Sequence, residues 1–496
     1  MDNILKNKIH SFETEWIVYI LILLTLVLRL AIYYTTSIFS FSDYGSYISV
    51  IERISSGDKV LLQNGNCLFA ISYMGYFAKY ILGSPDYFYL FNCIAGTLSS
   101  LIIYYILKNT FHSLLAGLLF VFISMIYTEF LTFSAVFYTP VIMILLLSIF
   151  VILLSSYYNN IKPLPVALSI MGLIAIFLTT FFFKPELLFF PIFLIVFSLF
   201  FVRKDKIFMF RSLVLAFVLF TSQILFNNLH IITQPYKNVV SSQFVFFGHT
   251  NYGGDGGEGD FVYSENESRY NRSLEEWCTK NGITKPSTIE INRFQRDEVL
   301  KFITKTPLAW LKLQGTKFFR TFGVVPETTS FKILYTGLLK GNLWLTSIVV
   351  VVPVALVILM FICIFNLGSI RKLLKPSTIQ HIKATPHTAD SIQDTGRSEH
   401  FFYVYFLLFF YYLIASIFFG QYQERYRLPI MVVFIIPILS YFVATFDKKN
   451  FFSKVSLSIK IGVIMLFLVI WMLQVNRTIS NVARLDNFRE SIKVTK

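Results

Sequence analysis

The chain has 496 residues, of which 55% are hydrophobic and only 14% are charged, and its formal net charge is +15. Soluble domains carry roughly 25% charged residues, so this composition excludes an ordinary soluble protein and indicates a polytopic membrane protein. The excess of Lys and Arg would suit nucleic-acid binding, but its distribution along the chain follows membrane topology instead.

Apolar runs long enough to cross a bilayer of about 30 Å recur along the whole chain. They predict about eleven transmembrane helices, at residues 16–38, 86–107, 111–130, 134–156, 164–183, 186–202, 208–229, 346–367, 401–420, 428–446 and 457–475. No small-residue cleavage site follows the first run, so we interpret it as an uncleaved span rather than a signal peptide. With the N-terminus inside, the basic connectors lie in the cytoplasm, as the positive-inside rule expects. These connectors carry Lys6, Lys8, Lys108, Lys162, Arg203, Lys204, Lys206, Arg371, Lys372, Lys375, Lys448, Lys449 and Lys454.

The expected fold is an all-α polytopic membrane protein with one inserted domain. Residues 1–229 form an N-terminal membrane module, 230–345 an α-rich extracytoplasmic loop domain, and 346–475 the C-terminal membrane helices, before a tail at 476–496. The segment 368–400 is rich in Ser, Thr, Lys and His, so we interpret it as a flexible cytoplasmic loop without a function of its own.

Two shorter helices are expected in the first outer loop, within residues 44–82. Residues 44–56 place apolar side chains at helical spacing, and residues 67–82 form an apolar run that Lys79 interrupts. Both are predicted to lie at the membrane surface. The alternative for 67–82 is a short or tilted span, which would invert every later loop and place the basic connectors outside.

Charged residues stand at the predicted outer boundary of the membrane. Asp43 follows the first apolar run within one or two helical turns, and Lys184 follows the fifth. The stretch 420–429, Gly-Gln-Tyr-Gln-Glu-Arg-Tyr-Arg-Leu-Pro, sets Arg425 and Arg427 between two apolar runs. Charge is expensive at that depth and marks functional positions, so these residues indicate a site that handles an anion.

Each of these residues also has a structural interpretation. Asp43 can cap the surface helix that follows it. Arg425 and Arg427 can reach lipid headgroups or pair with Glu424, and Lys184 can anchor its helix in the interface. Other charged residues near these positions are interpreted as structural: Glu52, Arg53, Lys79, Glu129 and Glu186.

The loop domain contains a glycine-rich stretch at 246–260. Glycine lets the backbone bend closely round a ligand, so the candidate substrate contacts here are Asn251, Tyr252, Asp255 and Glu258. Carboxylates at 255, 258 and 260 can also hold a divalent cation, and a mobile solvated loop is the alternative. Further along, Ile303–Phe322 mixes aromatic residues with Lys and Arg, which predicts an interfacial helix leading back to the membrane.

Other chemistries lack their motifs. The seven His and four Cys residues show neither a metal-ligand spacing nor His-Glu-x-x-His, and no Gly-x-Ser-x-Gly is present. Zinc and serine-hydrolase chemistry are therefore excluded, and no cofactor beyond a divalent cation is expected. Cys67 and Cys278 both fall outside, which leaves a disulfide and two unrelated thiols as alternatives.

A carboxylate and several cations beside a large apolar volume suit group transfer from a lipid phosphate. The lipid tail can stay in the bilayer while Arg holds the phosphate as a fork and Lys as a point charge. A carboxylate opposite them can take the proton from an incoming hydroxyl.

This layout resembles that of the GT-C glycosyltransferases, the group that includes protein O-mannosyltransferases and lipid A aminoarabinose transferases. The resemblance covers most of the chain and rests on the acid after the first span (Asp43), on Lys184-Pro185, on the glycine-rich loop and on Arg-Tyr-Arg-Leu-Pro at 425–429. It implies an inverting enzyme that takes a sugar from a polyprenyl-phosphate donor to a hydroxyl of an extracytoplasmic glycan, lipid or protein. It further implies that Asp43 is the general base and that Arg425, Arg427 and Lys184 bind the donor phosphate.

The aromatic, lysine-rich composition suggests a low-GC bacterial source, so we expect undecaprenyl phosphate as the lipid and the bacterial inner membrane as the location, with the site facing outward. An O-antigen polymerase or ligase is the first alternative, and it would not depend on an acid after the first span. A lipid-linked saccharide transporter is the second, for which internal repeats and interrupted helices are expected. A receptor or scaffold built round the 230–345 loop is a third.

Overall fold

The structure is a computed structural model, and the part it describes is helical throughout, without a strand. The described residues are 2–35, 44–57, 69–160, 162–183, 187–201, 205–228, 265–322, 403–415 and 424–445, together with 246, 249, 250, 252, 355, 356, 462, 465, 468, 469 and 472. The predicted all-α class is confirmed for this part of the chain.

Six helices are long and apolar enough to cross a membrane: Trp16–Thr35, Pro85–Thr110, Pro140–Asn159, Pro163–Phe183, Lys206–Phe226 and Arg427–Ala444. A bent pair, Leu114–Ile126 with Thr128–Ser134, raises the number to seven if it counts as one span. An integral membrane protein with six or seven candidate spans is therefore confirmed among the described residues. Within the described residues, the predicted runs at 186–202 and 401–420 contain the apolar helices Phe190–Phe200 and Tyr403–Ala415, which are shorter than a span, and those at 346–367 and 457–475 lie largely outside the described residues.

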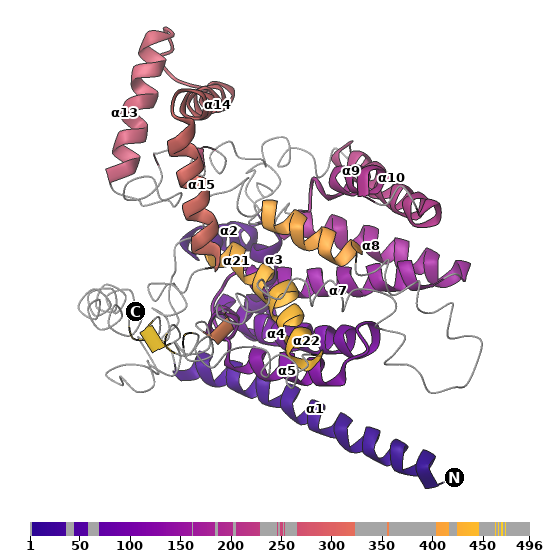
Figure 1. The fold of residues 1–496 in the computed structure, drawn as a ribbon. Helices are drawn as coiled ribbons and strands as arrows, with labels where there is room; N and C mark the ends of the chain where they lie inside the picture. Colours follow the sequence, from indigo (N-terminus) through magenta and orange to yellow (C-terminus); the bar gives the residue numbers. More distant parts are fainter. Residues whose placement is uncertain are drawn as a thin grey trace.

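The helices pack into one bundle, whose interior is built from aromatic and branched aliphatic side chains. Helix α1 (Asp2–Thr35) packs against α4 (Phe88–Tyr105), α5 (Leu114–Ile126) and α6 (Thr128–Ser134). Helix α7 (Pro140–Asn159) lies between α4 and α8 (Pro163–Phe183), and α10 (Lys206–Asn228) joins α8 to α9 (Phe190–Phe201). Proline opens both α7 and α8, where its missing N–H leaves no helical hydrogen bond unmade. Figure 1 shows these helices running side by side, with the N-terminal end of α1 projecting from the bundle.

The last described span contains a π-helical turn just after Arg427. Helix α21 (Glu424–Pro429) packs against α7, continues through a π-helical turn at Ile430–Ile435, and becomes α22 (Ile436–Thr445), which packs against α5. Pro429 has no N–H to donate, and a local π turn is a common way for a helix to absorb such a defect. The turn is completely buried.

The two shorter helices after the first span are present as α2 (Tyr44–Ser55) and α3 (Phe69–Leu82), which pack against each other. Helix α3 has 14 residues, about 21 Å at 1.5 Å per residue, so it is too short to cross the bilayer upright. A Cβ on Gly75 would lie only 2.6 Å from atoms of Ile51 and Phe137, so α3 approaches both α2 and the main bundle here without room for a side chain. The predicted helices are confirmed, and their position at the membrane surface stays a prediction.

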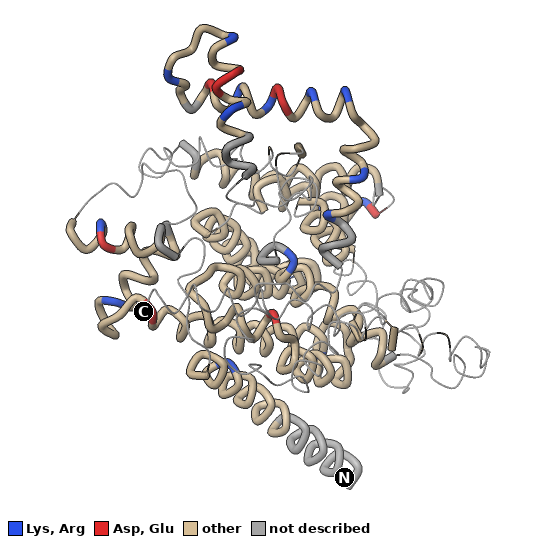
Figure 2. Tube along the Cα trace, turned by 90° about the vertical axis from the view of Figure 1, so that its left-hand side faces the viewer, with Lys and Arg blue, Asp and Glu red and all other residues tan. Residues whose placement is uncertain are grey.

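The loop domain supplies α13 (Glu265–Lys280), α14 (Thr288–Lys305) and α15 (Pro307–Phe322). A capping box between Ser287 and Glu290 starts α14. The helix predicted at Ile303–Phe322 is confirmed as α15, but it begins at Pro307, because α14 ends at Lys305 and proline starts a separate helix. Its interfacial position stays a prediction. These three helices stand above the bundle in both views, and Figure 2 shows that they carry a large share of the charged residues while the bundle interior carries few.

Candidate functional site

Two of the predicted site residues have described side chains. Arg427 lies at the start of the last described span, and Tyr252 lies in the loop domain. For Arg425 the structure describes only the helical backbone of α21. The remaining predicted site residues lie outside the described part of the chain: Asp43, Lys184, Asn251, Asp255 and Glu258.

Arg427 forms a buried ion pair with Glu129. Its Nε donates to Oε2 of Glu129 over 3.2 Å, and its Nη2 donates to Oε1, so the two nitrogens of one edge of the guanidinium meet the two oxygens of the carboxylate. Each side chain is only 5% exposed. This fork-on-fork geometry is the strong form of an Arg–carboxylate contact, and it also fixes the orientation of both groups.

The short helix α6 positions Glu129. Tyr127, the residue before α6, adopts an extended conformation (φ −75°, ψ 101°) and breaks the span, so that α5 and α6 meet at 63°. The Tyr127 hydroxyl then donates to Oε2 of Glu129 over 2.7 Å. Our sequence interpretation treated Glu129 as structural and the run 111–130 as one span. The structure instead breaks that run two residues before the carboxylate that Arg427 binds.

The segment after α6 connects this ion pair to α2, the helix that follows Asp43 in the sequence. Asn92 on α4 donates through its amide nitrogen to the carbonyl oxygens of Val136, over 2.7 Å, and Tyr138, over 3.1 Å. The ring of Tyr47 on α2 contacts the ring of Tyr138 edge-on, at 6.2 Å between centroids. Since α2 begins at Tyr44, directly after Asp43 in the sequence, the start of α2 and the α6–α7 connection lie at the same end of the bundle. In Figure 1 α2 and α21 both lie at this end, where α1 also ends.

A second buried arginine, Arg29, was missed in the sequence interpretation. It lies inside the first span at 0% exposure, with its guanidinium carbon 4.1 Å from the ring centre of Phe130. Nη1 donates to the Phe130 carbonyl oxygen and to the Ser134 hydroxyl, both over 3.3 Å. Its Nε and Nη2 have no hydrogen-bond partner among the described residues. The missed signal was a charge between two leucines within the first apolar run, because intramembrane charge is by default a sign of function.

Gly96 makes room for this arginine. A Cβ on Gly96 would lie 2.9 Å from Nε of Arg29 and 3.2 Å from Oγ of Ser134. No side chain larger than hydrogen fits there without moving one of them. Helix α4 can therefore approach the guanidinium closely on this side only because residue 96 is glycine.

The buried charges of the bundle do not balance. Among its described residues, Arg29, Arg427 and Glu129 are the buried ones that carry charge, which makes two positive groups and one negative. An uncompensated charge in a medium of low dielectric is strongly unfavourable. The region of α1, α6 and α21 therefore suits the binding of an additional anion.

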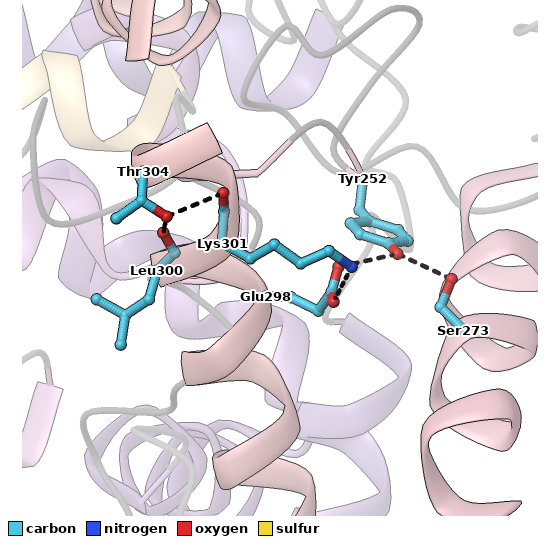
Figure 3. A network of polar contacts seen from close by, with 6 residues as sticks. All are labelled: Tyr252, Ser273, Glu298, Leu300, Lys301 and Thr304. Atoms are coloured by element: carbon cyan, nitrogen blue, oxygen red, sulfur yellow. Dashed lines mark hydrogen bonds and ion pairs between the residues drawn. The ribbon is translucent and has the colours of Figure 1, made fainter. Parts of the chain in front are cut away.

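Tyr252 has a structural position in the loop domain. Its ring packs with Phe246 and Val299, and its hydroxyl donates to Oγ of Ser273 over 2.8 Å, with a longer contact of 3.5 Å to Oε2 of Glu298. Glu298 in turn accepts from Nζ of Lys301 over 2.8 Å (Figure 3). These contacts join the glycine-rich stretch to α13 and α14, and they favour a role in folding the domain for Tyr252.

The loop domain also contains a polar cluster that the sequence interpretation did not find. His249 is buried, and its Nδ1 accepts from Nε1 of Trp310 over 3.0 Å and lies 3.4 Å from Nε2 of Gln314. Lys317 follows one turn later on α15 and is 1% exposed. Burial lowers the pKa of Lys317 to about 7, because the ammonium form loses hydration. The signal in the sequence was the spacing of 310, 314 and 317, which places the three residues on one face of a helix.

Neither a metal centre nor a disulfide is found in the described part of the chain. It contains no group of three or more His, Cys, Asp or Glu residues that could hold a metal ion, and the predicted acidic cation site at 255–260 lies outside it. Cys278 is a buried free thiol in α13, and Cys67 lies outside the described residues. Comparison with protein-family models, curated proteins and solved structures found no match for this chain.

Proposed function

We propose that the protein is an integral membrane glycosyltransferase that moves a sugar from a polyprenyl-phosphate donor to a hydroxyl group of an extracytoplasmic glycan, lipid or protein. The observation that carries this proposal is the buried guanidinium of Arg427 at the first residue of a candidate span. It lies at the same end of the bundle as α2, which begins directly after Asp43. A phosphate-binding cation and a carboxylate base would thus share one end of the membrane domain.

The donor's two parts suit the two environments found there. Its polyprenyl chain would remain in the bilayer beside exposed apolar side chains, such as Phe77, Tyr80 and Ile81 on the predicted surface helix α3. Its phosphate would receive hydrogen bonds from the planar fork of Arg427, with Arg425 and Lys184 as further cations. Arginine suits this position better than lysine, because its guanidinium is more weakly hydrated and stays charged when buried.

The reaction balances with these groups alone. The Asp43 carboxylate takes the proton of the acceptor hydroxyl as its oxygen attacks the anomeric carbon of the sugar. The bond between that carbon and the phosphate oxygen breaks with inversion, and the phosphate keeps the electron pair. Arg427, Arg425 and Lys184 stabilise the negative charge that develops on this leaving group. The products are the glycosylated acceptor and polyprenyl phosphate, and the proton on Asp43 passes to solvent.

One observation favours a second candidate, a transporter of lipid-linked saccharides. Broken helices with charged residues near the break are typical of transporters, and α5 and α6 meet at 63° beside the buried Glu129. The sequence did not predict this break, so the structure gives the transporter an interrupted helix that the sequence did not show.

The deciding experiment follows donor consumption by mass spectrometry, with purified protein in nanodiscs, a panel of synthetic polyprenyl-phosphate sugars and acceptor extracts. Asp43→Asn tests the base, and Asp86→Asn is its matched control, because Asp86 is a carboxylate just before α4 that we place outside the reaction. We expect consumption by the wild type and the control, and none by Asp43→Asn, although that variant still binds the donor. If the Asp43→Asn variant still consumes the donor, Asp43 is not the general base. Movement of intact donor between the leaflets of proteoliposomes, without consumption, would favour the transporter.

A further inference from the structure

The anion-binding edge of Arg427 is already occupied in this structure. Glu129 takes the Nε and Nη2 donors together, and these are the donors that a phosphate would need to bind this edge of the guanidinium bidentately. A phosphate can therefore gain that edge of the guanidinium only if the carboxylate leaves it. Two anions competing for one buried fork cannot both bind, because like charges at that distance repel strongly.

The carboxylate has a second buried arginine close to its own helix. Arg29 touches Phe130, the residue after Glu129, through both its ring and its carbonyl oxygen. Two of its nitrogens, Nε and Nη2, lack a hydrogen-bond partner among the described residues while the side chain is completely buried. Unpaired buried donors of this kind are uncommon and call for an explanation.

The break at Tyr127 makes α6 separable from the span before it. Helix α6 runs only from Thr128 to Ser134, and the bend of 63° ends its continuity with α5. Arg29 on α1 holds it through one nitrogen, which donates to the Phe130 carbonyl oxygen and to the Ser134 hydroxyl. The exchange requires α6 to rotate so that Glu129 moves from the side of α21 toward the side of α1. Bistable elements of this size are common in switching proteins.

We propose that Glu129 is an internal anion that holds Arg427 until a phosphate ester displaces it, and that Arg29 then receives the carboxylate. The ligand would thereby supply the second anion that the two buried arginines lack in its absence. Without ligand, Arg29 is the unpaired arginine, and with ligand each arginine has one anion. This device rests on the proposed function only in taking a lipid phosphate as the physiological ligand.

Binding to the purified full chain tests the displacement, with a short-chain polyprenyl phosphate as the probe. Glu129→Gln removes the competing charge but keeps the shape, so we expect it to bind the probe about tenfold more tightly than the wild type, which corresponds to a modest difference in binding free energy. Arg427→Gln should abolish binding. Arg29→Gln should weaken binding, because the displaced carboxylate then has no partner. Arg211→Gln is the matched control, since Arg211 also donates to backbone carbonyls but lies on α10 and reaches the C-terminal end of α7. This variant should bind the probe as the wild type does.

The combination of the two variants gives the sharpest result. In the Glu129→Gln background, Arg29→Gln should have little further effect, because no carboxylate remains to be received. Independent effects of the two changes would overturn the exchange, and a loss of binding in Glu129→Gln would show that Glu129 positions Arg427 instead of competing for it. Glu129→Asp, whose shorter side chain keeps the charge but loosens the pair, should tighten binding by a smaller factor, and it replaces Glu129→Gln if that variant does not fold.

Two further probes show whether the phosphate group or the lipid chain displaces Glu129. Inorganic phosphate that follows the same pattern across the variants supports displacement by the phosphate group alone. An uncharged polyprenol that follows this pattern overturns the proposal, since it brings no anion to Arg427. If the variants bind the probe as expected but no sugar is transferred, the exchange of Glu129 between Arg427 and Arg29 is supported and the proposed transferase activity is not. If sugar is transferred but Glu129→Gln binds the donor more weakly, the transferase stands and the exchange fails.

Discussion

Arg427 and Glu129 lie 298 residues apart in the sequence, yet Nε of the arginine donates to Oε2 of the glutamate over 3.2 Å inside the membrane bundle. The pair joins the first turn of the last described span to a short helix that follows a break in an earlier one. Tyr127, at the break, holds the same carboxylate oxygen through its hydroxyl. The contact thus connects Arg427, the candidate anion-binding residue, with α6, the short helix that follows the 63° break.

The first prediction concerns the stability of this pair. Arg427→Met alone and Glu129→Leu alone should each lower the free energy of unfolding by about 3–5 kcal/mol, because each leaves one buried charge without its partner. The double variant should recover much of this loss, since it removes both charges. Thermal unfolding in one detergent, analysed as a double-mutant cycle, measures the coupling.

The control for this cycle is the exposed pair of Arg296 and Asp297 in α14, whose side chains are 67% and 44% exposed. Removing either of them should change stability by no more than about 1 kcal/mol. Equal losses at the buried and the exposed pair would contradict the argument from burial.

The second prediction concerns the space beside Arg29. Gly96→Ala should destabilise the protein by about 1–3 kcal/mol, because the added methyl group would overlap Nε of Arg29 in a packed interior. Gly315→Ala in α15 is the matched control, since nothing lies within 4 Å of the position of its Cβ. That change should stabilise its helix by about 0.4–1 kcal/mol. A neutral Gly96→Ala in thermal unfolding would mean that α1 and α4 do not pack this closely.

The third prediction concerns pH and Lys317. Burial lowers the pKa of Lys317 from 10.5 to about 7, so between these values the unfolded domain binds more protons than the folded one. Stability therefore rises as pH increases from about 7 to 10.5, and it is lowest below 7, where the folded domain must bury the ammonium form. Lys317→Met should remove this dependence and raise stability at neutral pH.

Pulse proteolysis of the full chain at pH 6.5 and pH 9.5, followed at α13–α15, measures that difference. Lys312→Met is the control, because Lys312 is exposed on the same helix. A domain whose resistance to proteolysis is the same at both pH values in the wild type would refute the prediction.

The fourth prediction separates folding from substrate binding at Tyr252. Tyr252→Phe removes the hydrogen bond to Ser273 and should lower the stability of the loop domain by about 0.5–1.5 kcal/mol. Ser273→Ala should have a similar effect, since it breaks the same bond from the other side. The KM for the donor should not change in either variant. A higher KM in Tyr252→Phe but not in Ser273→Ala would return Tyr252 to the candidate substrate contacts.

The sequence predicted the helical class, the two short helices after the first span and most of the described spans. These features depend on local apolar periodicity and on the length needed to cross a bilayer, both of which are visible in a single segment. It also placed Arg427 correctly at the start of a span. It did not predict the break at Tyr127, because neither glycine nor proline interrupts residues 118–139. It also did not foresee that α14 would end before Pro307.

The pairing of the buried charges was decided by tertiary structure alone. The sequence by itself determined that Arg29, Glu129 and Arg427 must lie in or beside membrane helices, since apolar runs surround each of them. Which of them meet depends on how α1, α6 and α21 pack, and such packing joins residues from three distant segments. Ion pairs need atoms placed to within a few tenths of an ångström, and only the assembled bundle supplies that precision for Arg427 and Glu129. The same packing leaves two nitrogens of Arg29 without a hydrogen-bond partner among the described residues.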